Sequence, residues 1–213
     1  MDELELLKKD WKKKASYPKL SFDEIHKMIW KKSSSIVKWI FIISIIEFTL
    51  PNLLYFVPKV KEGMEVYKAM GLEPIMLTLT IIQWTVIIYF IFQFYKRYKE
   101  ISVLDSAKNL MKNIIKTRRT VRNYVIFCLT MLVVTIVSIW VGIYLTDDIS
   151  AFYDGVSLPE DFNPEKLRNI MLIAIAIAGT VLTVVMGVVY FLLYGLLLRK
   201  LHKNYKELKE LNV

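Results

Sequence analysis

Cysteine and histidine are scarce in this sequence. Its 213 residues include one cysteine, Cys128, and two histidines, His26 and His202. A single cysteine excludes a disulfide within the chain and a Cys-rich zinc site, and no histidine is paired with a glutamate at metal-ligand spacing. We therefore expect no metal and no other cofactor.

Catalytic signatures are missing as well. The seven glycines are scattered, so they form no Gly-rich phosphate loop. Neither histidine lies in an apolar stretch beside a serine or cysteine, as nucleophilic catalysis would need. The apolar stretches also lack the paired aspartates or the Ser/His pair of an intramembrane protease. The sequence therefore predicts a protein that is not an enzyme.

Charge is missing from long stretches of the chain, which is 55% hydrophobic. The longest of them, Ile170 to Leu198, has no charged residue at all. A helix of that length is about 43 Å long, more than the ~30 Å hydrocarbon core of a bilayer. Similar stretches lie near 36–57, 74–95 and 124–145. The predicted fold is an all-α membrane protein with four transmembrane helices arranged as two hairpins.

Lysine and arginine are distributed unevenly between the connecting segments. Of the 29 in the chain, 23 lie in residues 1–35, 96–123 and 199–213, and five lie in residues 58–73 and 147–169. The positive-inside rule therefore places both termini in the cytoplasm. We accordingly divide the chain into cytoplasmic amphipathic helices (1–35), a transmembrane bundle (36–198) with a cytoplasmic segment (96–123), and a cytoplasmic helical tail (199–213).

The first 35 residues predict two short polar helices. Ser21 and Glu24 have the spacing of a capping box, which starts the second of them. Apolar residues beside lysines here fit either an interfacial helix on anionic lipid headgroups or a docking surface for a cytoplasmic partner. The candidate partner-binding residues are Trp11, Ile25, Met28 and Trp30.

The same region resembles a known family. The stretches Leu7–Trp11, Tyr17–Ile25 and Lys32–Trp39 resemble the opening of a family of bacterial four-span inner-membrane proteins. Genes of that family are often found beside extracytoplasmic-function sigma factors. The resemblance implies a multi-pass protein of the bacterial inner membrane with an anti-sigma-like role. The leading hypothesis is thus a regulatory or scaffolding protein that holds a cytoplasmic partner, with a sigma factor as the candidate.

Two polar side chains lie at similar depth within the predicted spans. A carboxylate near the middle of a bilayer is costly, so Glu47 should face the bundle. Gln83 of the second span should then form a hydrogen bond with Glu47 and hold the first hairpin together. The alternative function is a small transporter or ion-conducting subunit that uses Glu47 and Gln83.

Helical periodicity continues past the spans on the basic side. It predicts one helix from about Ser106 to Leu145, and the tail after Leu198 continues the stripe of the fourth span. We therefore predict that helices project beyond the bilayer and pack as a small basic stalk. At the other end, Asn163 and Pro164 predict that the fourth helix begins before its apolar stretch.

A basic cluster precedes the third span. We expect it to lie on phospholipid headgroups and to determine topology, with phosphate or nucleic-acid binding as the alternative. The aromatic residues do not alternate with these charges as a stacking platform requires, so we expect no direct contact with nucleic acid. The lipid-headgroup residues are Lys112, Lys116, Arg118, Arg119 and Arg122.

Small residues recur every four positions in the fourth span, at Gly179, Thr183 and Gly187. Such a ridge lets another helix approach closely, either within the monomer or across a homodimer. A structural subunit that packs laterally through this ridge is the third hypothesis.

Overall fold

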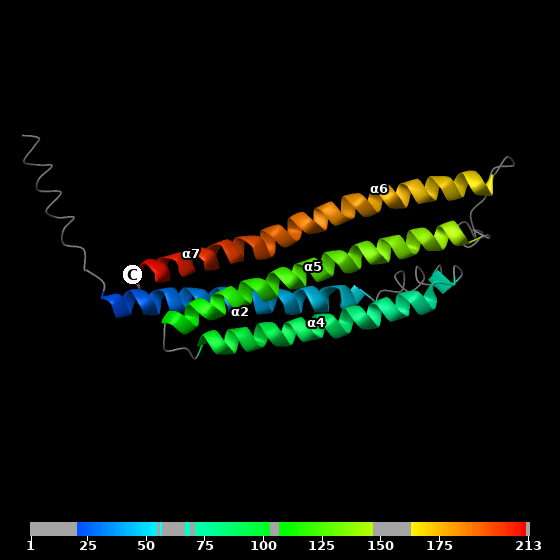
Figure 1. Ribbon diagram of the computed structural model, residues 1–213. Coiled ribbons are helices and arrows are strands. Elements are labelled where there is room, and N and C mark those ends of the chain that lie inside the picture. The colour runs from blue at the N-terminus through cyan, green and yellow to red at the C-terminus, as the bar shows by residue number, and fades with distance from the viewer. Residues whose placement is uncertain are drawn as a thin grey trace, which may run out of the picture.

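The computed structural model describes residues 21–54, 56, 67–68, 71–102, 107–146 and 163–211. These residues form α2 (Phe22–Leu54), α4 (Glu73–Ser102), α5 (Ala107–Leu145), α6 (Pro164–Tyr190), the short π-helix η2 (Phe191–Gly195) and α7 (Leu196–Leu211). Because α6, η2 and α7 follow one another without a break, four long rods lie side by side (Figure 1). The all-α fold is confirmed, and four helices are long and apolar enough to cross a membrane.

The starts of two helices agree with the sequence. The Ser21 backbone N–H donates to Glu24 Oε2 at 2.8 Å, and the Glu24 N–H donates to Ser21 Oγ at 3.2 Å, which confirms the capping box. The bond from the Ser21 N–H lowers the pKa of the Glu24 carboxyl, because it favours the charged form. The Asn163 side chain accepts from the N–H groups of Glu165 and Lys166, with Pro164 in the first turn.

The predicted long helix is also confirmed. α5 runs for 39 residues from Ala107 to Leu145, a length of about 57 Å. In the fourth rod, α7 continues the helical path of α6 through η2 as far as Leu211. The predicted grouping of the rods into two membrane hairpins remains a prediction.

The rods pack in a ring. α2 contacts α4, α4 contacts α5, α5 contacts α6, and α7 returns to α2. Two clusters of buried side chains follow one another along the axis of this ring. The first involves the basic ends of the rods, and the second lies within their apolar parts.

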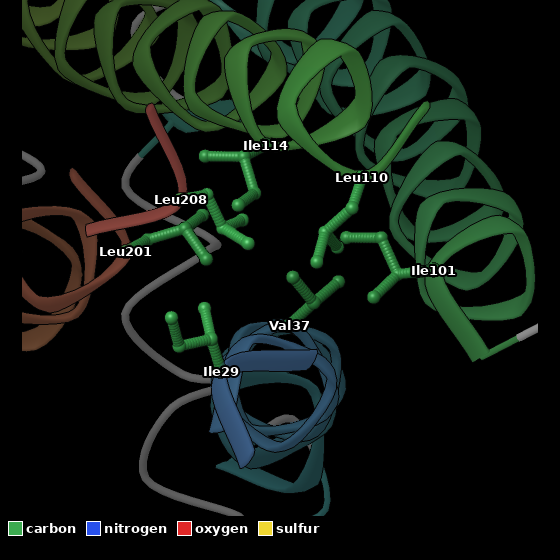
Figure 2. Close-up of a cluster of buried hydrophobic side chains, with 7 residues drawn as sticks. All are labelled: Ile29, Val37, Ile101, Leu110, Ile114, Leu201 and Leu208. Carbon is green, nitrogen blue, oxygen red and sulfur yellow. The ribbon is translucent and has the colours of Figure 1, made fainter. Parts of the chain in front are cut away.

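The first cluster, which we term the stalk core, joins all four rods. Figure 2 shows its side chains pointing toward one another from α2, α4, α5 and α7. This confirms that the predicted basic segments pack against each other, while their position relative to a bilayer stays a prediction. The stalk core consists of Ile29, Val37, Ile101, Leu110, Ile114, Leu201 and Leu208.

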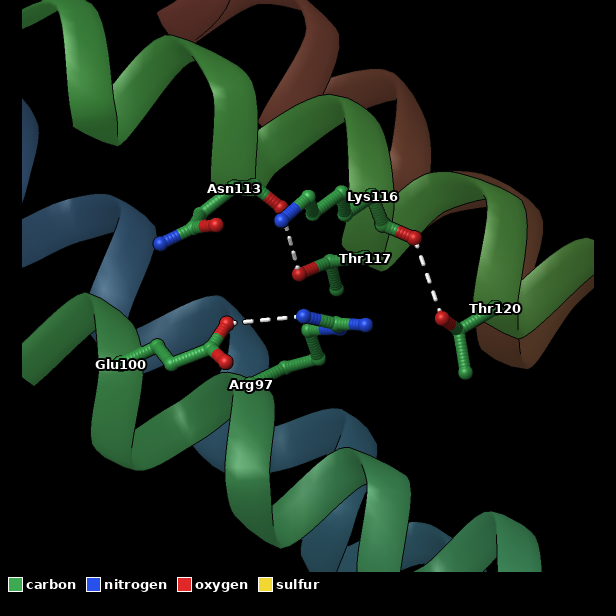
Figure 3. Close-up of polar contacts among 6 residues, drawn as sticks. All are labelled: Arg97, Glu100, Asn113, Lys116, Thr117 and Thr120. Atoms are coloured by element: carbon green, nitrogen blue, oxygen red, sulfur yellow. Dashed lines mark hydrogen bonds and ion pairs between the residues drawn. The ribbon is translucent and has the colours of Figure 1, made fainter.

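Polar contacts link the same rods around the stalk core. Asn204 of α7 donates from Nδ2 to the Ser33 hydroxyl of α2 at 3.0 Å, and both side chains are buried. Arg97 and Glu100 form an ion pair at 2.8 Å within α4, and they point toward α5 (Figure 3). Buried polar groups need specific partners, so the contact between Asn204 and Ser33 favours one orientation of α7 against α2.

The second cluster, which we term the aromatic core, is built largely from rings. Tyr124 of α5 packs edge-on against Phe94 of α4 and against Tyr194 of η2, with ring centroids 5.4 and 5.8 Å apart. Edge-to-face pairs of this kind contribute about 0.5–1.5 kcal/mol beyond the area they bury. The aromatic core consists of Ile40, Ile87, Phe94, Val121, Tyr124, Tyr190 and Tyr194.

Candidate functional site

Glu47 is a half-buried carboxylate in the apolar part of α2. Its two oxygens accept hydrogen bonds from two phenols of the fourth rod. The Tyr194 hydroxyl donates to Oε2 at 2.8 Å, and the Tyr190 hydroxyl donates to Oε1. Because a buried carboxylate without donors is costly, these two bonds allow Glu47 to occupy an apolar bundle.

The spacing of the two tyrosines explains why both reach the same carboxylate. Side chains four residues apart lie on one face of a helix, one above the other. η2 begins directly after Tyr190 and contains Tyr194, and the two rings stack with centroids 6.1 Å apart.

The predicted hydrogen bond between Glu47 and Gln83 is wrong. Both oxygens of Glu47 accept from tyrosines of the fourth rod, whereas the Gln83 side chain is exposed on α4. Equal depth along two helices does not place two side chains on facing sides. The neighbour of Gln83, Trp84, is the residue whose ring meets Phe48 of α2.

The surroundings of Glu47 are closed by a third tyrosine and by the cysteine. Tyr124 packs against Tyr194, and Cys128 lies one turn further along α5 against the same aromatic core. In the described part of the chain, no three His, Cys, Asp or Glu side chains are grouped as a metal would need. The site therefore offers phenol, thiol and carboxylate groups inside an apolar bundle.

A groove between α5 and the fourth rod reaches the outer side of these tyrosines. We term it the arginine groove. Its volume is about 640 Å³, within the ~300–1,000 Å³ of small-molecule sites. Arginines of α5 line one end, and apolar residues line the rest. The lining residues are Ile115, Arg118, Arg119, Val121, Arg122, Val125, Ile126, Gly187, Tyr190, Phe191, Tyr194, Gly195 and Leu198.

The five predicted lipid-headgroup residues fall into two sets. Arg118, Arg119 and Arg122 line the arginine groove. Lys112 and Lys116 are exposed on α5 and do not line it. The sequence alone grouped all five as one cluster. The groove wall that the three arginines share appears only when α5 and the fourth rod are placed together.

The family comparison covers nearly all of this architecture. A family model described as a domain of unknown function, DUF8845, matches residues 23–213. The chain belongs to the DUF8845 family. The match includes Glu47, both of its tyrosines and the whole arginine groove. No curated protein and no solved structure matches the chain.

The DUF8845 match begins at Asp23, so it includes three of the four predicted partner-binding residues. Ile25 and Trp30 pack against the stalk core, and the Trp30 Nε1–H donates to the Ile101 carbonyl at 2.7 Å. Other rods of the stalk therefore partly cover these two side chains, and their role in binding a partner stays a prediction. Met28 is 46% exposed and remains accessible. Trp11 lies outside the described residues.

The two glycines in the fourth rod of this DUF8845 protein lie on different surfaces, one packed against α5 and one open to the arginine groove. A Cβ on Gly179 would lie 2.5 Å from Ile136 Cγ2, so this glycine allows α5 and α6 to approach closely. Thr183 donates to the Gly179 carbonyl within its own helix. A Cβ on Gly187 would meet no atom within 4 Å, and this glycine lines the arginine groove. A homodimer through the ridge remains a prediction.

Proposed function

We propose that this DUF8845 protein crosses a bacterial inner membrane four times, with both termini in the cytoplasm. We further propose that it is a non-enzymatic regulator or scaffold whose stalk holds a soluble cytoplasmic protein. Four helices of sufficient length and apolar character support the crossings, and the excess of lysine and arginine at one end supports the orientation.

The stalk is the observation that carries the proposal. A chain that had only to cross a bilayer could end its helices at the headgroups. All four rods contribute side chains to the separate stalk core at their basic ends, which supports a role beyond crossing a bilayer. The outer side of α2 exposes Met28 among Lys27, Lys31 and Lys32, and this basic, partly apolar surface suits an acidic surface on a soluble protein. The family resemblance makes a sigma factor the candidate partner.

Reporter fusions test the orientation. Alkaline phosphatase is active only outside the cytoplasm, whereas green fluorescent protein folds well inside it. Phosphatase fused after Gly63 or Gly155 should be active, and a fluorescent protein fused after Val213 should be bright. Phosphatase that is inactive at both loops would overturn the proposed crossings.

Crosslinking in living cells tests the partner. A photo-reactive amino acid at Met28 should trap a cytoplasmic protein, and the same protein should co-purify with the detergent-extracted chain. The matched control is Tyr144, which is 60% exposed near the far end of α5 and should trap no cytoplasmic protein. The charge reversal Lys27→Glu with Lys31→Glu should abolish the crosslink at Met28. A crosslink that survives the reversal, or none from wild-type Met28, would count against the scaffold function.

The carboxylate between two phenols favours one second candidate, an ion-conducting or transport subunit. Glu47, Tyr190 and Tyr194 form a chain of exchangeable protons within the apolar part. In proteoliposomes, Glu47→Gln should then abolish proton or cation flux. Gln83→Leu should leave the flux unchanged, because Gln83 is not hydrogen-bonded to Glu47 or to its two tyrosines. Equal flux in wild type and Glu47→Gln would remove this candidate.

A further inference from the structure

We propose that the arginine groove binds one anionic phospholipid. Its phosphate lies against Arg119 and Arg122, and one acyl chain follows the groove toward Gly187. This inference rests on the membrane insertion proposed above, but not on the cytoplasmic partner.

Positive charge without a carboxylate partner at one end of the groove indicates where an anionic headgroup binds. Arg119 and Arg122 are exposed, and neither forms an ion pair with a carboxylate in the described part of the chain. Arg118 shares a hydrogen bond of 2.9 Å with Nδ1 of His202, which ties α5 to α7 beside them. Among the residues that the structure describes, no acidic one lines the groove. Arginine is well suited to phosphate, because its planar fork donates two parallel hydrogen bonds.

The remainder of the groove is apolar and continues into the predicted hydrocarbon region. Ile126 of α5 and Phe191 of η2 are 56% and 50% exposed along its walls. Gly187 lines the same groove, and a Cβ added there would meet no atom within 4 Å, so the wall is open at this position. Gly187 precedes Arg199, the first charge after the apolar stretch, by twelve residues, or about 18 Å of helix. The groove thus runs from the basic interface into the apolar part, as an acyl chain does.

The π-helix shapes the wall beside the arginines. Phe191 is its first residue, and its ring lies over Gly195, where an added Cβ would come within 3.1 Å of it. The Arg199 guanidinium stacks on the same ring at 4.9 Å from its centroid. This contact places another cation near the arginine end, which further favours an anionic headgroup over a zwitterionic one.

A second groove extends the same seam. It lies between α5 and α6, has a volume of about 430 Å³, and is lined by residues that include Val133, Val137, Thr180 and Val184. These residues continue the spacing of Ile126 on α5 and of Gly187 on α6. An acyl chain that enters at the arginines therefore has an apolar track beyond the first groove.

Native mass spectrometry of the detergent-purified chain with added lipid tests the site. The probe is phosphatidylglycerol, with phosphatidylcholine of the same acyl chains as its zwitterionic control. We expect one phosphatidylglycerol to bind at least tenfold more tightly than phosphatidylcholine. Arg119→Gln with Arg122→Gln should lose at least about tenfold in affinity. The matched control, Lys112→Gln with Lys116→Gln, removes the same charge outside the groove and should bind as wild type.

A second variant tests the acyl-chain part without changing charge. Gly187→Leu fills an open position, so it should fold as wild type and yet lose the bound phosphatidylglycerol. Glycerol 3-phosphate, which carries the phosphate without acyl chains, should not displace the lipid at equal concentration.

Four results would overturn the proposal: no preference for phosphatidylglycerol, equal loss in the lysine control, full binding by Gly187→Leu, or displacement by glycerol 3-phosphate. A wild-type chain that is recovered from cells without detergent would instead refute membrane insertion itself.

Discussion

The Tyr194 hydroxyl and the Glu47 carboxylate lie 147 residues apart in the sequence and meet at 2.8 Å. Together with Tyr190, this contact joins the first rod to the last one inside the aromatic core. It also places the Glu47 site beside the arginine groove. Tyr190 and Tyr194 donate hydrogen bonds to the carboxylate, and both residues line the groove as well.

Removing both phenol donors should destabilise the bundle. Tyr190→Phe with Tyr194→Phe keeps the rings but leaves both Glu47 oxygens without their partners, which should cost about 1–3 kcal/mol for each bond lost. Thermal unfolding in detergent measures the loss, and Tyr144→Phe, at a 60% exposed position, is the control. Adding Glu47→Met to the double variant removes the unsatisfied carboxylate and should recover most of the stability. No recovery would contradict the view that the two hydroxyls stabilise the bundle by donating to the Glu47 carboxylate.

The stalk should depend on the buried contact between Ser33 and Asn204. Ser33→Ala leaves the amide of Asn204 without its partner, and an unsatisfied buried group costs about 1–3 kcal/mol. Ser35→Ala is the matched control, because Ser35 is exposed on the same helix. Hydrogen exchange across residues 196–211 should rise in the first variant and not in the second. Equal exchange in both would show that this bond contributes little.

The two glycines of the fourth rod should respond oppositely to substitution. Gly179→Ala places a Cβ against Ile136 and should destabilise the chain by about 1–3 kcal/mol through overpacking. Gly187→Ala should be tolerated, because its Cβ meets nothing. Unfolding midpoints compare the two. Ile136→Ala removes the Cγ2 atom that the new Cβ would meet, so Gly179→Ala with Ile136→Ala should cost less than the two single changes added together. A defect in lateral association would not show this coupling.

Trp30 should anchor the end of α4 to α2. Trp30→Phe keeps an aromatic ring on the stalk core but removes the donor to the Ile101 carbonyl, at an expected cost of about 1 kcal/mol. The last turn of α4 should then exchange its amide hydrogens faster, as hydrogen-exchange mass spectrometry would detect. Protection equal to wild type in that turn would refute the anchoring role.

Helix limits were largely predictable because charge, proline and capping residues mark them in the sequence. Asn163 with Pro164 marked the start of α6, and uninterrupted spacing before Val125 marked α5 as one long helix. In the stalk, polar residues alternate with apolar ones, so the periodicity itself shows which side is buried. That is why the packing of the basic segments could be predicted.

Within the apolar stretches, the periodicity no longer shows which side of a helix is buried. When residues on every side of a helix are apolar, composition does not show which side faces a neighbour. Depth alone suggested Gln83 as the partner of Glu47, and the rotation of α4 made that prediction wrong. One signal was present, since Tyr190 and Tyr194 are phenols four residues apart in a stretch without charge. The arginine groove had no comparable signal, because its walls come from two rods whose relative placement only the structure provides.

α5 passes through both buried clusters as one uninterrupted helix, contributing Leu110 and Ile114 to one and Val121 and Tyr124 to the other. No glycine or proline stands between these residues to act as a joint. A stiff rod transmits tilt rather than absorbing it, and a 5° rotation about one end of a ~57 Å helix moves the other end by about 5 Å. A tilt of α5 in one cluster would therefore displace the residues that the same helix contributes to the other.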